Sequence, residues 1–224
     1  ACRKCAEGYA KIVMEKKNGM SNPLIDEAHF SGIFNDELYG KIIRRVLSSA
    51  EIITYNSFTA DILRKNLVNP KVHVIPGGFD PESIPLRTNY VTNNEVFSIF
   101  VPGRMNDPAK GASTAIKAGE ILAKAGLNFK MKITMNPSEQ SPAWLNQCGW
   151  MTHCDTLEEM RKADCVLVPS IWEEAFGMTW VEAMASGTAV IAGNVAGPAE
   201  YSNGKALLFK PGNAEDLALK IKDL

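Results

Sequence analysis

The chain has 224 residues, 46% of them hydrophobic and 22% charged, which is enough apolar material to bury the core of one large or two small domains. Its 24 basic and 25 acidic side chains nearly cancel, and no basic block stands out, so we expect no nucleic-acid partner. No apolar stretch approaches the roughly 20 residues of a membrane span, and the first residues lack the apolar centre of a secretory signal, so we expect a cytoplasmic protein.

Five cysteines are an odd number for a disulfide framework. Cys165 lies inside an apolar strand candidate, which favours reduced thiols. Cys2 and Cys5 form a single C-x-x-C motif, but a zinc site would need about two more ligands, and the cysteine and histidine residues of segment 148–154 do not match the usual second half. We therefore expect no bound metal.

The first ninety residues predict a helix followed by a strand–helix–strand unit. Segment 35–50 carries Leu38, Ile42 and Val46 at helical spacing, with Asn35 as its N-cap. Residues 51–56 predict a short strand, Ser57 is expected to cap the next helix, and residues 71–78 predict a strand that ends in glycines. Residues 79–94 contain two prolines and no apolar period, which predicts a linker.

The second half alternates strands and helices throughout. Strands are predicted over 96–104, 129–134, 165–170, 189–194 and 206–210, and helices over 110–126, 156–163, the segment around Glu182, and 214–224. Asp155 and Glu158 have the spacing of a capping pair at a helix start. Uniformly apolar strands separated by helices predict a parallel, doubly wound sheet. We expect domains at 1–92, including the linker, and at 93–224.

In such a sheet, ligands bind beyond the carboxyl ends of the strands. Gly103 and Arg104 leave the strand at 96–104, and Lys110 and Gly111 open the next helix. Two cations beside a helix N-terminus suit a diphosphate, because the glycines allow close backbone approach and the helix supplies N–H groups. The alternative is that both cations are ordinary solvated charges.

Two further stretches follow strands. Residues 149–155 could offer backbone groups to a ring such as a nucleotide base. Glu174 lies in the loop after the strand at 165–170, and Glu182 lies in the helix that begins near Gly177. Carboxylates at these places can accept hydrogen bonds from the hydroxyls of a sugar and a ribose. The alternative is a solvated acidic loop that favours the helix dipole.

Four segments, in this order, resemble family 4 retaining glycosyltransferases with the GT-B fold. "VIPGGFD" (74–80) resembles the V-I-P-N-G-[VF]-D junction of that family, and "GRMNDPAKG" (103–111) resembles its donor-phosphate motif. "EEAFGMTWVEAMASGTAVIA" (173–192) is similar to its E-x7-E signature, and "ALLFKPGNAEDLALKI" (206–221) to its closing segment. The resemblance covers about residues 50–224.

The resemblance implies an α/β GT-B-like protein with a Rossmann-like donor domain and a truncated N-terminal α/β domain. Arg104 and Lys110 would hold the diphosphate of a UDP- or GDP-linked sugar donor, Glu174 the sugar hydroxyls, and Glu182 the ribose. Backbone near sugar and phosphate would come from residues that include Gly103, Phe176, Gly177, Met178 and Thr179. Transfer to a hydroxyl acceptor would occur with retention, without a side-chain nucleophile, a divalent metal or another cofactor.

The acceptor side is less complete than in the family. The opening strands, glycine-rich loop and histidine of its first domain have no match here, and His29 does not correspond to that histidine. The acceptor, whether carbohydrate, lipid-linked or a small molecule, is not indicated, and peripheral membrane contact is left open. An incomplete sheet favours a homo-oligomer or a complementary subunit, with apolar residues from Ile33 to Val46 in the contact.

Three functions remain open. The first is a glycosyltransferase or its donor-binding portion. The second is a non-catalytic nucleotide-sugar-binding module or one part of a split glycosyltransferase. The third is an epimerase on the same fold, which would need catalytic acids in the first domain that we do not find in the sequence.

Overall fold

The computed structural model describes residues 37–87 and 96–224 of the chain. It divides into two compact units, the first ending at Ile75 and the second beginning at Pro76. Asn35, His29, Cys2 and Cys5 lie outside the described residues. The predicted boundary at 92–93 also lies in an undescribed segment, so it stays a prediction.

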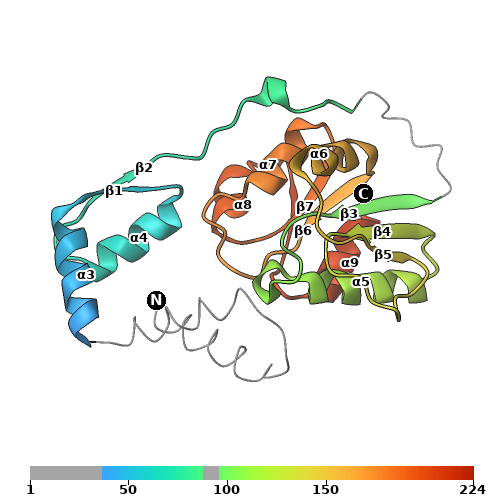
Figure 1. Ribbon diagram of the computed structural model, residues 1–224, viewed down its shortest axis with the longest axis horizontal. Coiled ribbons are helices and arrows are strands. Elements are labelled where there is room, and N and C mark those ends of the chain that lie inside the picture. The colour runs from blue at the N-terminus through green and yellow to red at the C-terminus, as the bar shows by residue number, and fades with distance from the viewer. Residues whose placement is uncertain (1–36, 88–95) are drawn as a thin grey trace. The chain divides into compact units, whose positions relative to one another are not determined.

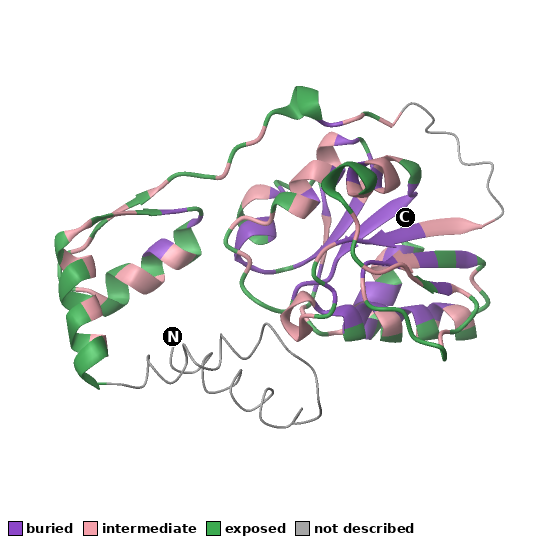
Figure 2. Cartoon of the chain, in the orientation of Figure 1, coloured by how far each residue is buried: buried purple, intermediate pink, exposed green. Residues whose placement is uncertain are grey.

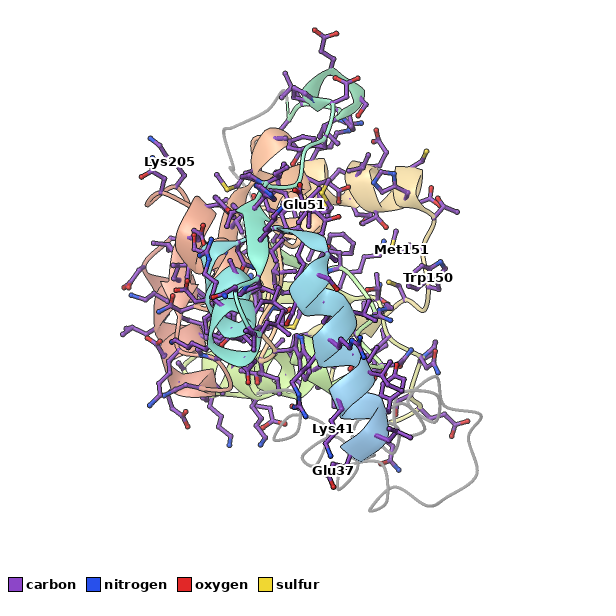
Figure 3. The ribbon with its side chains drawn as sticks, turned by 90° about the vertical axis from the view of Figure 1, so that its left-hand side faces the viewer. Glu37, Lys41, Glu51, Trp150, Met151 and Lys205 are labelled. Carbon is purple, nitrogen blue, oxygen red and sulfur yellow. The ribbon has the colours of Figure 1, made fainter. Side chains whose placement is uncertain are left out.

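The described part of the first unit is the predicted helix and strand–helix–strand unit. Its elements are α3 (Glu37–Ser49), β1 (Glu51–Thr54), α4 (Ser57–Asn66) and β2 (Lys71–Val74). β1 and β2 pair in parallel, with Glu51 opposite Lys71. On α3, Glu37 and Lys41 form an ion pair one turn apart at 3.0 Å, and both are labelled in Figure 3.

The expected cap of α4 is wrong by one residue. The side chain of Asn56, rather than that of Ser57, accepts a hydrogen bond from the Thr59 N–H at 2.7 Å, and Ser57 is the first helical residue. Both residue types are good N-caps, so local preference alone did not distinguish them.

The sheet of the second unit is parallel, with strand order β5-β4-β3-β6-β7-β8. Its strands are β3 (Phe97–Val101), β4 (Phe129–Ile133), β5 (Leu145–Gln147), β6 (Cys165–Val168), β7 (Ala189–Gly193) and β8 (Leu207–Phe209). This is the order of a Rossmann-like sheet, in which the chain reverses its winding direction between the two central strands. The predicted α/β fold with a doubly wound parallel sheet is confirmed, and the reversal lies between β3 and β6.

Helices cover both faces of this sheet (Figure 1). α5 (Ala112–Lys124) and α9 (Ala214–Lys222) lie on one face, and α6 (His153–Lys162), α7 (Met178–Ala185) and α8 (Ala196–Tyr201) lie on the other. Two short 3-10 helices, η1 (Pro81–Ser83) and η2 (Pro108–Lys110), lie in loops. Among the residues that the structure describes, no helix combines the length and apolar character needed to cross a bilayer.

Alternate residues of the strands pack into two separate cores, one on each face of the sheet. Ile99 and Val101 of β3 pack in the cluster beneath α5 and α9, whereas Phe100 between them packs with α6 and α7 on the opposite face. Successive side chains of a strand point to opposite faces of the sheet, so a strand that is covered on both sides must be apolar throughout. Figure 2 shows β6 buried along its length, whereas β3 is buried except for its first two residues.

Two elements of the second unit were not predicted, and one cap was misplaced. β5, with the sequence Leu-Asn-Gln, is mostly polar, and α8 has only six residues, too few to show a helical period. Helix α6 begins at His153, and Thr152 is its N-cap, accepting a hydrogen bond from the Asp155 N–H. The expected capping pair of Asp155 and Glu158 is therefore wrong, because both residues already lie inside the helix.

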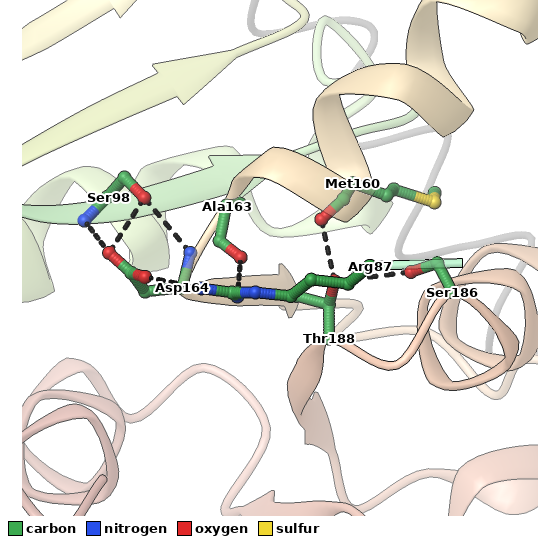
Figure 4. Close-up of polar contacts among 7 residues, drawn as sticks. All are labelled: Arg87, Ser98, Met160, Ala163, Asp164, Ser186 and Thr188. Carbon is green, nitrogen blue, oxygen red and sulfur yellow. Dashed lines mark hydrogen bonds and ion pairs between the residues drawn. The ribbon is translucent and has the colours of Figure 1, made fainter. Parts of the chain in front are cut away.

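The segment after the junction is attached to the second unit through Arg87 (Figure 4). Its guanidinium contacts the carbonyl of Ala163 and donates to Asp164 Oδ1 at 2.9 Å, and its backbone N–H donates to the carbonyl of Ser186 at 2.8 Å. The other carboxylate oxygen of Asp164 accepts two bonds of 2.9 Å from Ser98. Residues 76–87, predicted to be junction and linker, are thus bound to the second unit.

Candidate functional site

The candidate site lies where the chain leaves β3 and β6, the two strands at which the sheet reverses its winding. Their following loops, 102–111 and 169–177, are joined by backbone contacts: the Ile171 N–H donates to the Ala109 carbonyl at 3.0 Å. Gly111 has φ 76°, and a Cβ at this residue would lie 1.9 Å from the Pro169 carbonyl oxygen. Only glycine fits there, and the spacing between the two loops is therefore fixed by backbone.

Lys110 and Glu174 meet across these two loops. The Lys110 ammonium is ion-paired with Glu174 Oε1, and the side chains are 24% and 15% exposed. The same carboxylate oxygen accepts a hydrogen bond from the Ser170 hydroxyl at 3.2 Å. The predicted phosphate cation and the predicted sugar-binding acid are thus brought together, and Ser170, which sequence reasoning missed, helps to orient the acid.

Arg104 points to a different partner. Its guanidinium lies 3.7 Å from Asp107 Oδ2, three residues along the same loop, and its side chain is 63% exposed. The preceding Gly103 has φ 124°, and its carbonyl accepts a hydrogen bond from the Thr134 hydroxyl at 2.6 Å. The loop backbone is therefore fixed by the neighbouring strand, whereas the Arg104 side chain remains largely in solvent.

The loop after β6 is also held from the side of β7. Glu173 accepts a hydrogen bond from the Ala196 N–H at 2.7 Å, and the Glu174 carbonyl accepts one from the Gly197 N–H at 2.8 Å. The alternative of a solvated acidic loop does not include this contact of Glu173, because the contact depends on α8, which the sequence did not reveal. Both carboxylates therefore lie in a loop tied at several points.

Helix α7 begins next to this loop, as predicted. Gly177 is its N-cap, with φ 82° and no side chain to bond the first helical N–H groups. The Phe176 carbonyl accepts a hydrogen bond from the Trp180 indole N–H at 2.6 Å. Met178 is exposed and Thr179 is half-buried in the first turn of the helix. These residues present a turn of backbone beside Glu174, whose Oε2 lies 3.7 Å from where a Gly177 Cβ would be.

Glu182 has a partner that the sequence did not indicate. Its Oε1 lies 3.0 Å from His153 Nε2, at the first residue of α6, and only 13% of the Glu182 side chain is exposed against 66% of that of His153. His153 follows β5 by a short loop, and the position after a strand was the available signal. Glu182 is thus held by α6, separately from the Lys110–Glu174 pair.

Other titratable groups lie away from these contacts. Burial raises the pKa of Cys148 and, much more strongly, that of Cys165, so both thiols stay protonated. Both are free cysteines, as expected for a reduced thiol in the core strand. Across residues 37–87 and 96–224, no group of three or more His, Cys, Asp or Glu side chains could hold a metal ion. The candidate site therefore combines the Lys110 ammonium, paired with the Glu174 carboxylate, with the N-terminus of α7.

Part of the chain is similar to known proteins. Residues 144–224 match the family model of the glycosyl transferases group 1. The chain is 28% identical over 178 residues to the lipopolysaccharide 1,2-N-acetylglucosaminetransferase of Salmonella typhimurium, covering 69% of this chain and 46% of that protein.

Solved structures share the fold. Sucrose-phosphate synthase from Thermosynechococcus elongatus superposes with a TM-score of 0.68 at 21% identity, over 84% of this chain and 52% of that one. HepE from Anabaena, in complex with UDP and glucose, superposes with a TM-score of 0.66 at 18% identity, over 83% and 56%. The chain thus spans about half the length of the relatives it matches. The family model thus matches the C-terminal part of the chain, and the solved structures share its α/β fold with a parallel sheet.

Proposed function

We propose that this chain carries the donor side of a family 4 glycosyltransferase, which moves a sugar from a nucleotide-diphosphate sugar to a hydroxyl acceptor with retention of configuration. The observation that carries the proposal is the Lys110–Glu174 pair, which joins the loops after β3 and β6 at the reversal of the sheet. This is the place where doubly wound sheets bind ligands.

In this proposal Lys110 and Arg104 bind the diphosphate. An ammonium has three N–H donors, so Lys110 can keep Glu174 and still reach a phosphate oxygen. The contact of Arg104 with Asp107 is long and exposed, and such pairs contribute little, so the guanidinium can turn to a phosphate at small cost. Both cations would stabilise the negative charge that builds on the leaving diphosphate.

Two acids would bind hydroxyl groups. Glu174, fixed by Lys110 and Ser170, would accept hydrogen bonds from the donor sugar, and Glu182, fixed by His153, would accept them from the ribose. The backbone around Gly103 and from Phe176 to Thr179 would lie against phosphate and sugar. The HepE complex with UDP and glucose supports a UDP-linked donor for this chain, and a GDP-linked donor is the alternative.

The proposed reaction is a substitution on one face of the sugar. The bond from the anomeric carbon to the diphosphate oxygen breaks through an oxocarbenium-like state, and the acceptor oxygen bonds from the same face. The departing phosphate oxygen takes the acceptor proton, so neither a covalent carboxylate nor a resident metal or other cofactor is part of the proposal. Glu174, already paired with a cation and a hydroxyl, is suited to binding rather than to nucleophilic attack.

A second candidate is a nucleotide-sugar-binding module, or one part of a split enzyme. It is favoured by the position of the predicted site residues, all of which lie within Pro76–Leu224. Donor hydrolysis or sugar transfer by the purified chain would distinguish an enzyme from a module that binds without turnover.

Calorimetry tests the site itself, with UDP-glucose, UDP-N-acetylglucosamine, GDP-mannose and ADP-glucose as ligands. Lys110→Ala and Arg104→Ala should each lose about 1.5–3 kcal/mol of binding free energy, roughly tenfold or more in affinity. Lys117→Ala, an exposed cation further along α5, is the matched control and should leave affinity unchanged. If all three variants bind as the unmodified chain does, the phosphate assignment is wrong.

A further inference from the structure

Phe176 is enclosed from several sides in the middle of the loop that carries Glu174. Its ring centroid lies 5.6 Å from that of Tyr201 and 6.2 Å from that of Trp180, and its carbonyl accepts the Trp180 indole hydrogen bond. Gly197 lies against its backbone, because a Cβ there would be 2.4 Å from the Phe176 oxygen. The ring therefore has little freedom to move within the second unit.

Gly77 lies against this ring. A Cβ on Gly77 would lie 2.6 Å from Cδ1, 3.0 Å from Cε1 and 3.1 Å from Cγ of Phe176. The φ of Gly77 lies outside the left-handed region, so the requirement for glycine is one of space and not of backbone conformation.

We infer that Gly77 is a positioning residue for the donor site, setting the place of Phe176 and, through it, the Glu174–Gly177 turn and the start of α7. This inference rests on the proposed function. An added methyl group has to displace the Phe176 ring or the segment that carries Gly77. The segment is held further along by Ile84, which is buried in the core beneath α6 and α7, and by Arg87. Displacement of the ring reaches Glu174, because both belong to one short turn.

The test compares two neighbouring substitutions in the full chain. Gly77→Ala introduces the methyl group against Phe176, whereas Gly78→Ala introduces one where no atom lies within 4 Å. The first readout is the Trp180 indole N–H resonance in ¹⁵N-labelled protein, identified by its loss in Trp180→Phe. The second is the affinity for UDP-glucose by calorimetry.

Gly77→Ala should move the indole resonance and weaken UDP-glucose binding by roughly tenfold or more, since small misplacements of positioning groups have large effects. Gly78→Ala should do neither. In a Phe176→Leu background, the ring is replaced by a smaller side chain. Adding Gly77→Ala there should weaken UDP-glucose binding much less than Gly77→Ala does alone, as expected for two residues in contact. If Gly77→Ala alone does not fold, this double variant should recover folding.

The inference is overturned if Gly77→Ala leaves the indole resonance in place or if both alanine variants behave alike. It is equally overturned if Gly77→Ala weakens UDP-glucose binding as much in the Phe176→Leu background as it does alone. It is also overturned if the resonance moves while UDP-glucose affinity stays the same. Should the unmodified chain not bind UDP-glucose, the proposed function loses its support. The indole resonance then decides by itself whether Gly77 positions the turn.

Discussion

At the scale of single residues, other side chains of the protein already contact one carboxylate oxygen of each acid in the candidate site. Lys110 and Ser170 both contact Glu174 Oε1, and the other oxygen lies toward the Gly177 turn. His153 likewise takes one oxygen of Glu182. In each acid the protein fixes one oxygen, which orients the carboxylate and reduces the entropy lost when a hydroxyl binds to the other.

Replacing Gly177 by alanine should destabilise the chain more than replacing Gly126. Both have positive φ, of 82° and 79°, and so carry the left-handed penalty of about 1–2 kcal/mol for an L residue. A Cβ on Gly177 also lies 2.9 Å from Trp180 Cδ1, whereas nothing lies within 4 Å of one on Gly126. Denaturant unfolding of both variants measures the difference, and equal losses would contradict the contact.

His153→Ala should weaken binding of a nucleotide-sugar, because Glu182 loses the group that orients it. The loss should be about 0.5–1.5 kcal/mol, the net value of one hydrogen bond. His153→Gln, which keeps a donor, should recover part of it, and Cys154→Ala, at the exposed neighbour, should have no effect in calorimetry. Unchanged affinity in His153→Ala would show that His153 does not support the proposed ribose-binding role of Glu182.

At the scale of elements, the segment after Pro76 joins the second unit through a nearly buried ion pair. The side chains of Arg87 and Asp164 are 11% and 5% exposed. Burial tends to raise the pKa of Asp164, but hydrogen bonds from Ser98 and Arg87 lower it more, and the net pKa lies below the ordinary 3.8. A buried carboxylate of this kind depends on its partners for its charge.

The lowered pKa of Asp164 predicts that the unmodified chain loses stability in acid. The Asp164→Asn variant should not show this loss. A carboxyl group whose folded-state pKa is depressed stabilises the protein above its unfolded pKa, and the contribution is lost as the pH falls through the folded pKa. The free energy of unfolding of the unmodified chain should therefore fall toward that of Asp164→Asn below about pH 4. Urea unfolding between pH 7 and pH 3 tests this, and parallel curves would contradict it.

The sequence revealed more of the elements than of the contacts between them. The apolar strands and the longer helices of the second unit were predictable from their apolar runs and helical periods, whereas β5 is mostly polar and α8 has only six residues. The glycines, cations and carboxylates that follow the strands could also be identified from the sequence. The pairing of Glu182 with His153, 29 residues apart, was not, because it depends on how α6 and α7 pack.

At the scale of the whole molecule, every predicted site residue belongs to the second unit. The sheet, its two cores, Gly77 and the Arg87 contacts all fall within Pro76–Leu224. A domain with its own core is expected to fold independently. In the first unit, strands β1 and β2 are partly exposed. The apolar side chains of Leu38, Ile42 and Val46 on α3 are exposed. The predicted partner contact at this helix stays a prediction.

A protein consisting of residues 76–224 should therefore unfold cooperatively and bind nucleotide-sugars with the affinity of the full chain, within about threefold. Circular dichroism during heating and calorimetry provide the two measurements. A fragment that starts at residue 88 is the control, since it lacks Gly77, Ile84 and Arg87, and should be less stable. Loss of binding in the longer fragment would show that the first unit is needed for binding at the proposed donor site.

The close approach of Gly111 to the Pro169 carbonyl has a consequence for protein engineering. Because main chain alone sets the distance between the two loops, a saturation library at position 111 should return only glycine among folded clones. In a library meant to change the proposed donor site, variation therefore belongs at other positions of the two loops.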